Sequence, residues 1–288
     1  MVLDYEKILG SLPIWTQPVQ ISKLQGGLTN INYVIKVGKK RYVARFAPAS
    51  NTFLGLERDR EICNTKATTK LGIGPEYEAY FPEYNLLLLK YLSGKTCNPQ
   101  LARKPQMIKR LAKTLHQLHQ SNGFQGTDNP FKWIQRVIQL VKQKESWLPQ
   151  DIDSLLLDLK DIQKKVGPYK NVPCHMDLMI ENIIIYQNKI KIIDWEYSVN
   201  SDFRFDLAML SYKGSFEKRE DLLLLKEYGR EDLFQEIQLM KAVVALREAA
   251  WSATQLAFSS IPIDYRTYAE IDFEKYRKLI QTAKENTI

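Results

Sequence analysis

A short apolar hairpin with polar residues at its ends is the feature that most constrains this sequence. Residues 175–197 read HMDLMIENIIIYQNKIKIIDWEY, in which the pair QN separates NIIIY from KIKIID. The β-branched residues favour two stiff, buried strands joined by a tight turn. Antiparallel pairing of these strands would bring Asn182, which enters the first, close to Asp194, which leaves the second. Asp177 lies five residues before Asn182, so two carboxylates and an amide oxygen can converge on one point.

Oxygen ligands of this kind suit Mg²⁺, which favours one or two protein carboxylates with phosphates and water around it. Enzymes of phosphoryl transfer use the same layout, H-R-D-x-x-x-x-N followed by a second metal-binding Asp. Here the corresponding segments are HMDLMIEN and DWE. We therefore predict that Asp177 accepts the proton of an attacking hydroxyl and that Asn182 and Asp194 hold Mg²⁺ on the phosphates of ATP. Each residue by itself could equally be a loop cap.

The segment HMDLMIEN…IKIIDWEYSVNSDFRFDLA resembles the signature of the aminoglycoside phosphotransferase and choline kinase superfamily. GGLTNINY at 26–33 is similar to the nucleotide loop of the bacterial choline (or ethanolamine) kinase branch. The resemblance implies an ATP-dependent kinase of small alcohols with a protein-kinase-like fold. It also implies structural roles for His175 and for Asp206 in FDLA, which would brace the catalytic loop, although Asp206 could also act as a helix cap.

The pattern of the chain changes from β-rich to helical near residue 92. Strands are expected at NYVIKV and RYVARF, with Gly38 in the turn, and at EYEAYF and NLLLLKYL; a helix is expected at about 56–71. Beyond SGKTCNPQ, the patterns predict helices near 104–120, 130–144, 151–166, 205–213, 219–228, 231–258 and 272–284. We expect an α+β protein with two lobes, a small β-rich lobe at 1–92 that binds the nucleotide and a larger, mainly helical lobe at 93–288.

The β-rich lobe contains candidates for nucleotide binding. In RYVARF, the strand alternation places Arg45 on the face opposite Tyr42, Ala44 and Phe46, and a guanidinium can grip phosphate. The resemblance places its partner acid at Glu61, while Glu57, one helical turn away, is an alternative. Further phosphate contacts are expected from the loop residues, and adenine contacts from the strand end; the full set is Gly27, Thr29, Asn30, Asn32, Lys90 and Leu92. A plain hairpin turn would also need glycines.

The acceptor site is predicted from aromatic and acidic residues, because cationic alcohols such as choline bind to aromatic faces and carboxylates. Besides Asp177, the candidates are Glu196, Tyr197 and Trp251, and both Arg247 and Glu248 share a helix face with Trp251. These aromatic residues could instead belong to the core. Choline or ethanolamine is the expected acceptor, with thiamine, an aminoglycoside or another small molecule as alternatives. A kinase-like binding module without activity is the non-enzyme alternative.

Composition excludes several other classes. The net charge is +8, but basic and acidic residues are interleaved, whereas nucleic-acid binding needs a clustered basic surface. No apolar run is long enough for a membrane span, and the N-terminus does not read as a secretory signal. Three widely spaced cysteines predict neither disulfides nor a zinc site and fit the cytoplasm. His116 and His119, at i and i+3, are expected to be structural. The sequence predicts no particular oligomeric state.

Overall fold

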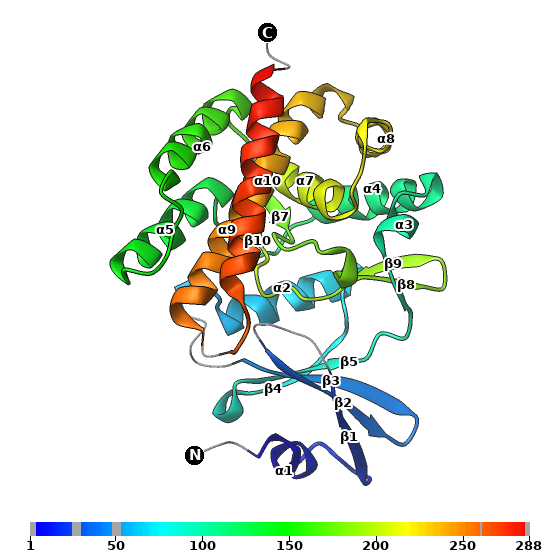
Figure 1. Cartoon of the computed structure of the whole chain (residues 1–288). Coiled ribbons are helices and arrows are strands. Elements are labelled where there is room, and N and C mark those ends of the chain that lie inside the picture. The colour runs from blue at the N-terminus through cyan, green and yellow to red at the C-terminus, as the bar shows by residue number, and fades with distance from the viewer. Residues whose placement is uncertain (1–3, 25–29, 48–52, 260, 286–288) are drawn as a thin grey trace.

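The computed structural model of the chain describes residues 4–24, 30–47, 53–259 and 261–285. It consists of a small lobe built on an antiparallel sheet and a larger lobe built from helices (Figure 1). The first described residues lie at the outer end of the sheet lobe, and the last described residues lie at the far end of the helical lobe. The predicted α+β architecture with two lobes is therefore confirmed.

Five strands in the order β1-β2-β3-β5-β4 form the sheet of the small lobe. They are β1 (Val19–Lys23), β2 (Ile31–Val37), β3 (Lys40–Phe46), β4 (Tyr77–Phe81) and β5 (Leu86–Lys90). Gly38, at φ +57°, turns β2 into β3 as predicted. Helix α1 (Tyr5–Gly10) and strand β1 lie outside the predicted elements. Leu9 of α1 is fully buried in the same apolar cluster as Tyr33, Ile35 and Leu88 of the sheet, so this helix closes one face of the lobe.

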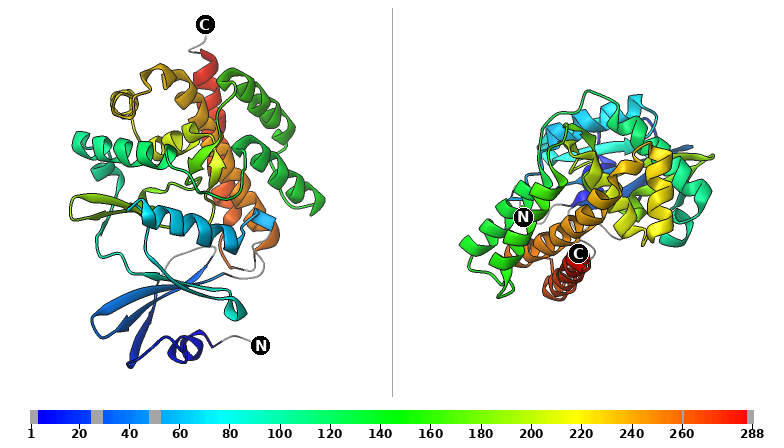
Figure 2. Two further views of the ribbon diagram at one scale, coloured as in Figure 1. Left: turned by 180° about the vertical axis from the view of Figure 1, so that it is seen from behind. Right: turned by 90° about the horizontal axis from the view of Figure 1, so that it is seen from above.

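Helix α2 (Arg58–Lys70) crosses between the sheet and the helical lobe, as the view from behind shows (Figure 2). It ends where predicted: Gly72 and Gly74 donate their backbone N–H groups to Thr69 and Thr68 carbonyls. Asn64 of α2 donates to the backbone carbonyl of Ser198 in the helical lobe at 2.8 Å. The helix therefore belongs to the interface between the lobes, where it can present side chains toward both.

The chain passes from the sheet to the helical lobe through residues 91–94. Strand β6 (Lys95–Thr96) already pairs with strand β8 (Ile183–Tyr186) of the helical lobe. A Cβ atom on Gly94 would lie 2.5 Å from Ile184 Cγ2 and 2.7 Å from the Ile185 carbonyl oxygen, so this position requires glycine. The connecting segment is therefore attached to the predicted catalytic hairpin as soon as it leaves the sheet.

The helical lobe is organised around α9 (Phe234–Phe258), which packs against α10 (Tyr265–Glu285), α7 (Phe203–Lys213) and α5 (Pro130–Gln143). The other elements of this lobe are α3 (Pro99–Ala102), α4 (Pro105–His119), α6 (Ile152–Val166), α8 (Lys218–Tyr228), β7 (Val172–Cys174), β9 (Lys189–Ile192) and β10 (Val199–Ser201). The short elements α3, β7 and β10 were not predicted, whereas α4, α5, α6, α7 and α8 begin within two residues of the predicted positions. At α5, the Asn129 side chain caps Phe131 and Lys132 before Pro130 at the first helical position.

One helix boundary was predicted wrongly. Helix α10 begins at Tyr265, seven residues before the expected start at 272. Asp264 accepts a hydrogen bond from the backbone N–H of Thr267 at 3.1 Å, which caps the extra turns. Tyr265 and Ala269 are buried, so packing against α9 extends the helix through a polar stretch with weak sequence periodicity.

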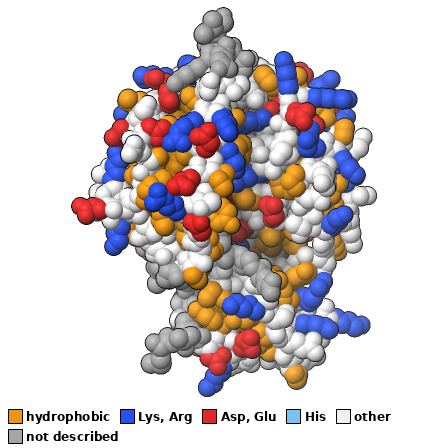
Figure 3. Space-filling view, viewed as in Figure 1, with side chains coloured by type: hydrophobic (Ala, Val, Ile, Leu, Met, Phe, Trp, Pro, Cys, Tyr) orange, Lys and Arg blue, Asp and Glu red, His pale blue; other side chains and the backbone are white. Residues whose placement is uncertain are grey.

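Charged side chains of both signs are interspersed on the face shown in Figure 3, which agrees with the interleaved charges of the sequence. None of the helices in the described part of the chain combines the length and the apolar character that crossing a bilayer requires.

Candidate active site

The predicted hairpin forms and brings its polar ends together. Strands β8 and β9 pair antiparallel with Ile183 opposite Ile192. One step further out, the Ile193 N–H donates to the Asn182 carbonyl at 2.9 Å, so Asn182 and Asp194 leave the hairpin at the same end. The Asn182 amide nitrogen donates to the Asp177 carbonyl at 3.1 Å. This bond ties Asn182 to the loop that carries Asp177 and leaves the amide oxygen as the ligand atom.

His175 links the Asp177 loop to the segment before Asp194. Its Nδ1 accepts from the Asp177 N–H at 3.2 Å, and its Nε2 lies 2.9 Å from the Ile193 carbonyl oxygen. Since a carbonyl oxygen only accepts, these two bonds require the neutral tautomer with the proton on Nε2. The ring is buried and lies against Trp195, with centroids 4.6 Å apart. The imidazole thus connects the backbone of Asp177 to that of Ile193, the residue before Asp194, which is in line with the bracing role predicted for it.

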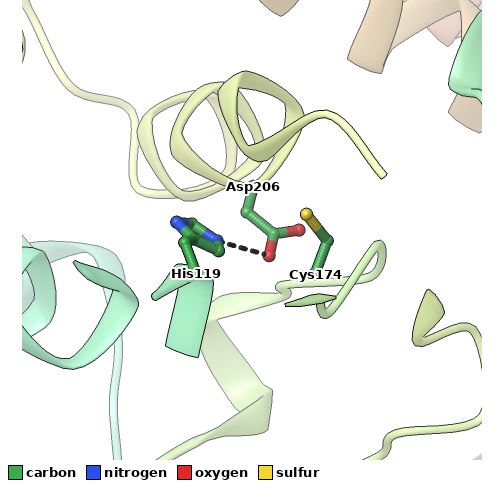
Figure 4. Close-up of side chains that lie close together, drawn as sticks. All are labelled: His119, Cys174 and Asp206. Carbon is green, nitrogen blue, oxygen red and sulfur yellow. Dashed lines mark hydrogen bonds and ion pairs between the residues drawn. The ribbon is translucent and has the colours of Figure 1, made fainter. Parts of the chain in front are cut away.

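Asp206 in α7 also binds the backbone of the loop that carries Asp177. Its carboxylate accepts the backbone N–H groups of His175 and Met176, at 2.7 Å and 2.9 Å. His119 Nε2 lies 3.1 Å from the same carboxylate, and Cys174 is the third member of this buried cluster (Figure 4). Although burial opposes ionisation, the hydrogen bond and charge of His119 hold the pKa of Asp206 below its usual range.

The surroundings of His119 explain the cluster without a metal role. The Tyr228 hydroxyl lies 2.8 Å from His119 Nδ1, so both ring nitrogens have hydrogen-bond partners. Both oxygens of Asp206 are also engaged, and burial raises the pKa of the Cys174 thiol well above its usual value. The geometry therefore agrees with the structural role expected for His119.

Two residues of this region have left-handed backbone conformations: Met176, which precedes Asp177, and Asp194. Met176 has φ +64° and Asp194 itself has φ +68°. Side chains other than glycine rarely adopt this region, and such residues concentrate at functional sites. The hydrogen bond from the Met176 N–H to Asp206 and that from the Asp177 N–H to His175 hold the backbone in place here.

Arg45 of β3 reaches the helical lobe directly. Its Nη2 atom lies 2.5 Å from Asp194 Oδ1, 3.4 Å from Glu196 Oε2 and 3.7 Å from Glu61 Oε1. The side chain is 7% exposed, and its Nε has no hydrogen-bond partner among the described residues. The partner acid in α2 is Glu61, since Glu57 is 70% exposed and pairs with Arg60. Arg58 also forms an ion pair with Glu61, a contact for which the sequence has no separate signal.

The other predicted nucleotide residues that the structure describes lie in two places, near Arg45 and at the end of β5. Asn30 is buried and donates to Glu196 at 2.5 Å, while Asn32 lies on β2 opposite Arg45. Lys90 ends β5 and forms an exposed ion pair with Glu76, and Leu92 follows in the connecting segment. Gly27 and Thr29 lie outside the described residues.

The predicted acceptor residues separate into two places. Trp251 Nε1 donates to the Tyr197 hydroxyl at 3.0 Å, so these two side chains meet. Glu196 instead faces Arg45 and Asn30 at the sheet lobe. The turn in which Ser198 N–H donates to the Trp195 carbonyl interrupts the alternation after Asp194, which explains why neighbouring residues point to different sites.

A buried arginine that sequence reasoning noted only as sharing the face of Glu248 and Trp251 completes the site. Arg247 of α9 donates through Nη1 to Asp177 Oδ1 at 2.9 Å and to Glu248 Oε1 at 2.8 Å. Lys213 Nζ lies 2.6 Å from the other oxygen of Glu248. Burial raises the pKa of Asp177; the Arg247 charge opposes this shift, and the charges of Glu248 and Asp194 add to it. A raised pKa suits a carboxylate that accepts a proton.

Comparison with known proteins gives consistent matches. A profile described as the phosphotransferase enzyme family matches residues 20–243. Protein LicA of Haemophilus influenzae is 25% identical over 210 residues, which cover 70% of this chain and 61% of that protein. The chain thus spans less than two thirds of the length of this relative. Ethanolamine kinase 2 of Mus musculus is 24% identical over 307 residues, which cover 93% of this chain and 78% of the relative.

Solved structures extend the likeness to the fold. The choline kinase LicA of Streptococcus pneumoniae superposes with a TM-score of 0.84 at 23% identity, over 96% of this chain and 98% of that chain. Both lobes therefore have the arrangement of a kinase-like protein, as the sequence resemblance implied.

Proposed function

The chain belongs to the phosphotransferase enzyme family, and on that premise we propose that it transfers the γ-phosphoryl group of ATP to the hydroxyl of a small alcohol. The observation that carries the proposal is the contact between Arg45 of the sheet lobe and Asp194 of the hairpin. When a nucleotide binds between two lobes, a phosphate-binding cation from one lobe and a metal-binding carboxylate from the other have to face the same phosphates.

In the proposed reaction, Asp177 accepts the proton of the acceptor hydroxyl. The hydroxyl oxygen forms a bond to the γ-phosphorus as the bond from phosphorus to the bridging oxygen breaks, and ADP leaves. The raised pKa of Asp177 makes it a stronger base than an exposed carboxylate. Arg247, which donates to one oxygen of Asp177, orients the carboxylate and keeps it ionised between turnovers.

The residues around Asp194 fit Mg²⁺ and ATP. A carboxylate and an amide oxygen, from Asp194 and Asn182, are the hard ligands that Mg²⁺ prefers. Bound Mg²⁺ would neutralise charge on the phosphates. The Nε of buried Arg45, which has no hydrogen-bond partner among the described residues, is a donor suited to a phosphate oxygen, and the ion pair with Glu61 orients that guanidinium. We further propose nucleotide contacts from the two loop residues outside the described part of the chain and from Asn30, Asn32, Lys90 and Leu92, and we assign 1–92 and 93–288 as the two lobes.

For the acceptor, we propose choline or ethanolamine, each a primary alcohol with a cationic nitrogen. The named activities of the relatives support this class, and so does the pair Tyr197–Trp251 close to Asp177. Glu196, which faces Arg45, is better suited to support the nucleotide side. Thiamine, aminoglycosides and other small alcohols are the alternative acceptors.

The test is ADP release over a panel of choline, ethanolamine, thiamine, homoserine, methylthioribose and an aminoglycoside. We expect Mg²⁺-dependent turnover with at least one of the first two, and none without an acceptor. Nucleotide binding without turnover of any alcohol on the panel would instead support a kinase-like binding module and overturn the proposed activity.

A further inference from the structure

The guanidinium of Arg247 lies against two aromatic rings inside the helical lobe. Its central carbon is 4.7 Å from the ring centroid of Tyr197 and 5.2 Å from that of Trp133. Both distances are within the range of favourable cation–π contact. Arg247 is 5% exposed, so these contacts are made away from water, where they are strongest.

The same guanidinium is held by two carboxylates, those of Asp177 and Glu248. Aromatic faces combined with nearby carboxylates are the surroundings that a quaternary ammonium ion requires, because it has no N–H group with which to hydrogen-bond. In this chain, those surroundings already contain a cation that is part of the protein.

Charge and volume both oppose a second cation at this place. Asp177 and Glu248 contribute two negative charges, and Arg247 and Lys213 contribute two positive charges at ion-pair distance. The cavity on the Trp133 side of this guanidinium, lined also by Tyr197 and Met176, has a volume of about 30 Å³. That is room for one or two water molecules, against roughly 300 Å³ or more for an ordinary ligand pocket.

We infer that Arg247 is a specificity-determining residue, a resident cation that occupies the aromatic faces beside Asp177 and excludes quaternary ammonium groups from them. The inference rests on the proposed function and narrows its substrate class. The preferred acceptor is an alcohol whose polar group carries N–H or O–H donors. Such a group can hydrogen-bond to the carboxylate oxygens of Glu248, which have lone pairs beyond those used by Arg247 and Lys213.

The test compares acceptors that differ only in nitrogen substitution: ethanolamine, its N-methyl and N,N-dimethyl derivatives, and choline. For the wild-type protein, we expect kcat/KM to fall as methyl groups replace N–H groups. Arg247→Met removes the charge and keeps an unbranched apolar stem. We expect this change to raise the ratio of kcat/KM for choline to that for ethanolamine by about tenfold or more, mainly through KM.

Taking a ratio cancels any general loss of activity from removing a partner of Asp177. Arg247→Lys keeps the cation and should retain the wild-type preference, and Arg247→Gln replaces the Met variant if that does not fold. Arg266→Met is the matched control: Arg266 also lies over an aromatic ring, Trp147, but is 52% exposed on α10, and its loss should leave the ratio unchanged.

Binding of tetramethylammonium, measured by calorimetry, tests the inference without any turnover. We expect heat of binding with Arg247→Met and none with the wild-type protein. Equal binding by both proteins, or an unchanged acceptor ratio, would overturn the role of Arg247. Failure of the wild-type protein to phosphorylate any alcohol would overturn the proposed function instead, and the tetramethylammonium measurement would still decide the present question.

Discussion

Arg45 and Asp194, which are 149 residues apart in the chain, form an ion pair of 2.5 Å across the two lobes. One belongs to strand β3 of the sheet, and the other directly follows the hairpin of β8 and β9. In this contact, the two groups that we assign to phosphate and metal neutralise each other. Binding of Mg²⁺ and ATP would insert opposite charges between them, so the contact marks the place of the phosphates.

Replacement of Asp177 by Asn should abolish most of the turnover. The amide cannot accept the hydroxyl proton, and loss of a general base typically costs about 10²- to 10⁴-fold in rate. Nucleotide affinity should stay nearly constant, because Asp177 lies on the acceptor side with Arg247. Steady-state kinetics and calorimetry with ADP measure the two effects. Asp161→Asn, at an exposed position of α6, is the control; a variant at 177 with normal kcat would refute the assignment.

Replacement of Asp194 by Ala should remove the dependence of ATP binding on Mg²⁺. In the wild-type protein, chelation of the metal by EDTA should weaken ATP binding, because the phosphates lose the cation that neutralises them. The variant should bind ATP weakly whether or not Mg²⁺ is present. Calorimetric titrations of both proteins, with and without Mg²⁺, provide the measurement. If ATP affinity and its metal dependence are unaltered, the metal role of Asp194 is wrong.

Two glutamates of the same region offer a matched comparison. Glu61→Gln should raise KM for ATP by about tenfold, since an ion pair with buried Arg45 is lost and the guanidinium is no longer held toward the phosphates. Glu57→Gln should have little effect, because this exposed side chain pairs with Arg60. Kinetics at saturating acceptor measure both. Equal effects of the two substitutions would show that the Arg45–Glu61 pair is not what orients the cation.

Asp206→Asn should destabilise the protein in a way that depends on pH. Because the pKa of Asp206 is lowered in the folded state, its ionised form stabilises the fold above the unfolded pKa, about 4. That contribution is lost as pH falls through the lower folded pKa. Urea unfolding should show a deficit of about 3 kcal/mol for the variant near pH 7, and the deficit should shrink below about pH 4. A deficit that does not change with pH would contradict this account.

The parts of the site that could be predicted from sequence are those set by local geometry. The hairpin follows from β-branched runs around a tight turn, and it alone fixes the distance between Asn182 and Asp194. Strand alternation was enough to orient Arg45 away from the core residues of β3. These positions depend on neighbours within a few residues, where backbone periodicity determines direction.

The parts that could not be predicted depend on contacts between distant segments. Glu57 and Glu61 are one helical turn apart. Only the packing of α2 between the two lobes places Glu61, rather than Glu57, beside Arg45. Helix α9 is buried on most of its surface, so no amphipathic face shows where Arg247 points. A charged residue within an otherwise apolar helix does indicate a buried ion pair, and this was the one sequence feature from which the role of Arg247 could have been inferred. Trp133, which supplies one of the two rings, has no comparable signal.

The attachment of Gly94 and β6 to strand β8 limits how the protein can open. Only residues 91–94 separate β5 of the sheet from β6, which pairs with the hairpin strand β8. A connection this short would allow the sheet lobe to tilt but would allow little sliding. Tilting of the sheet lobe about these residues would move Arg45 relative to the hairpin that carries Asn182 and Asp194. Nucleotide entry and the alignment of the metal ligands would then be parts of one movement, and a longer connection at Gly94 would uncouple them.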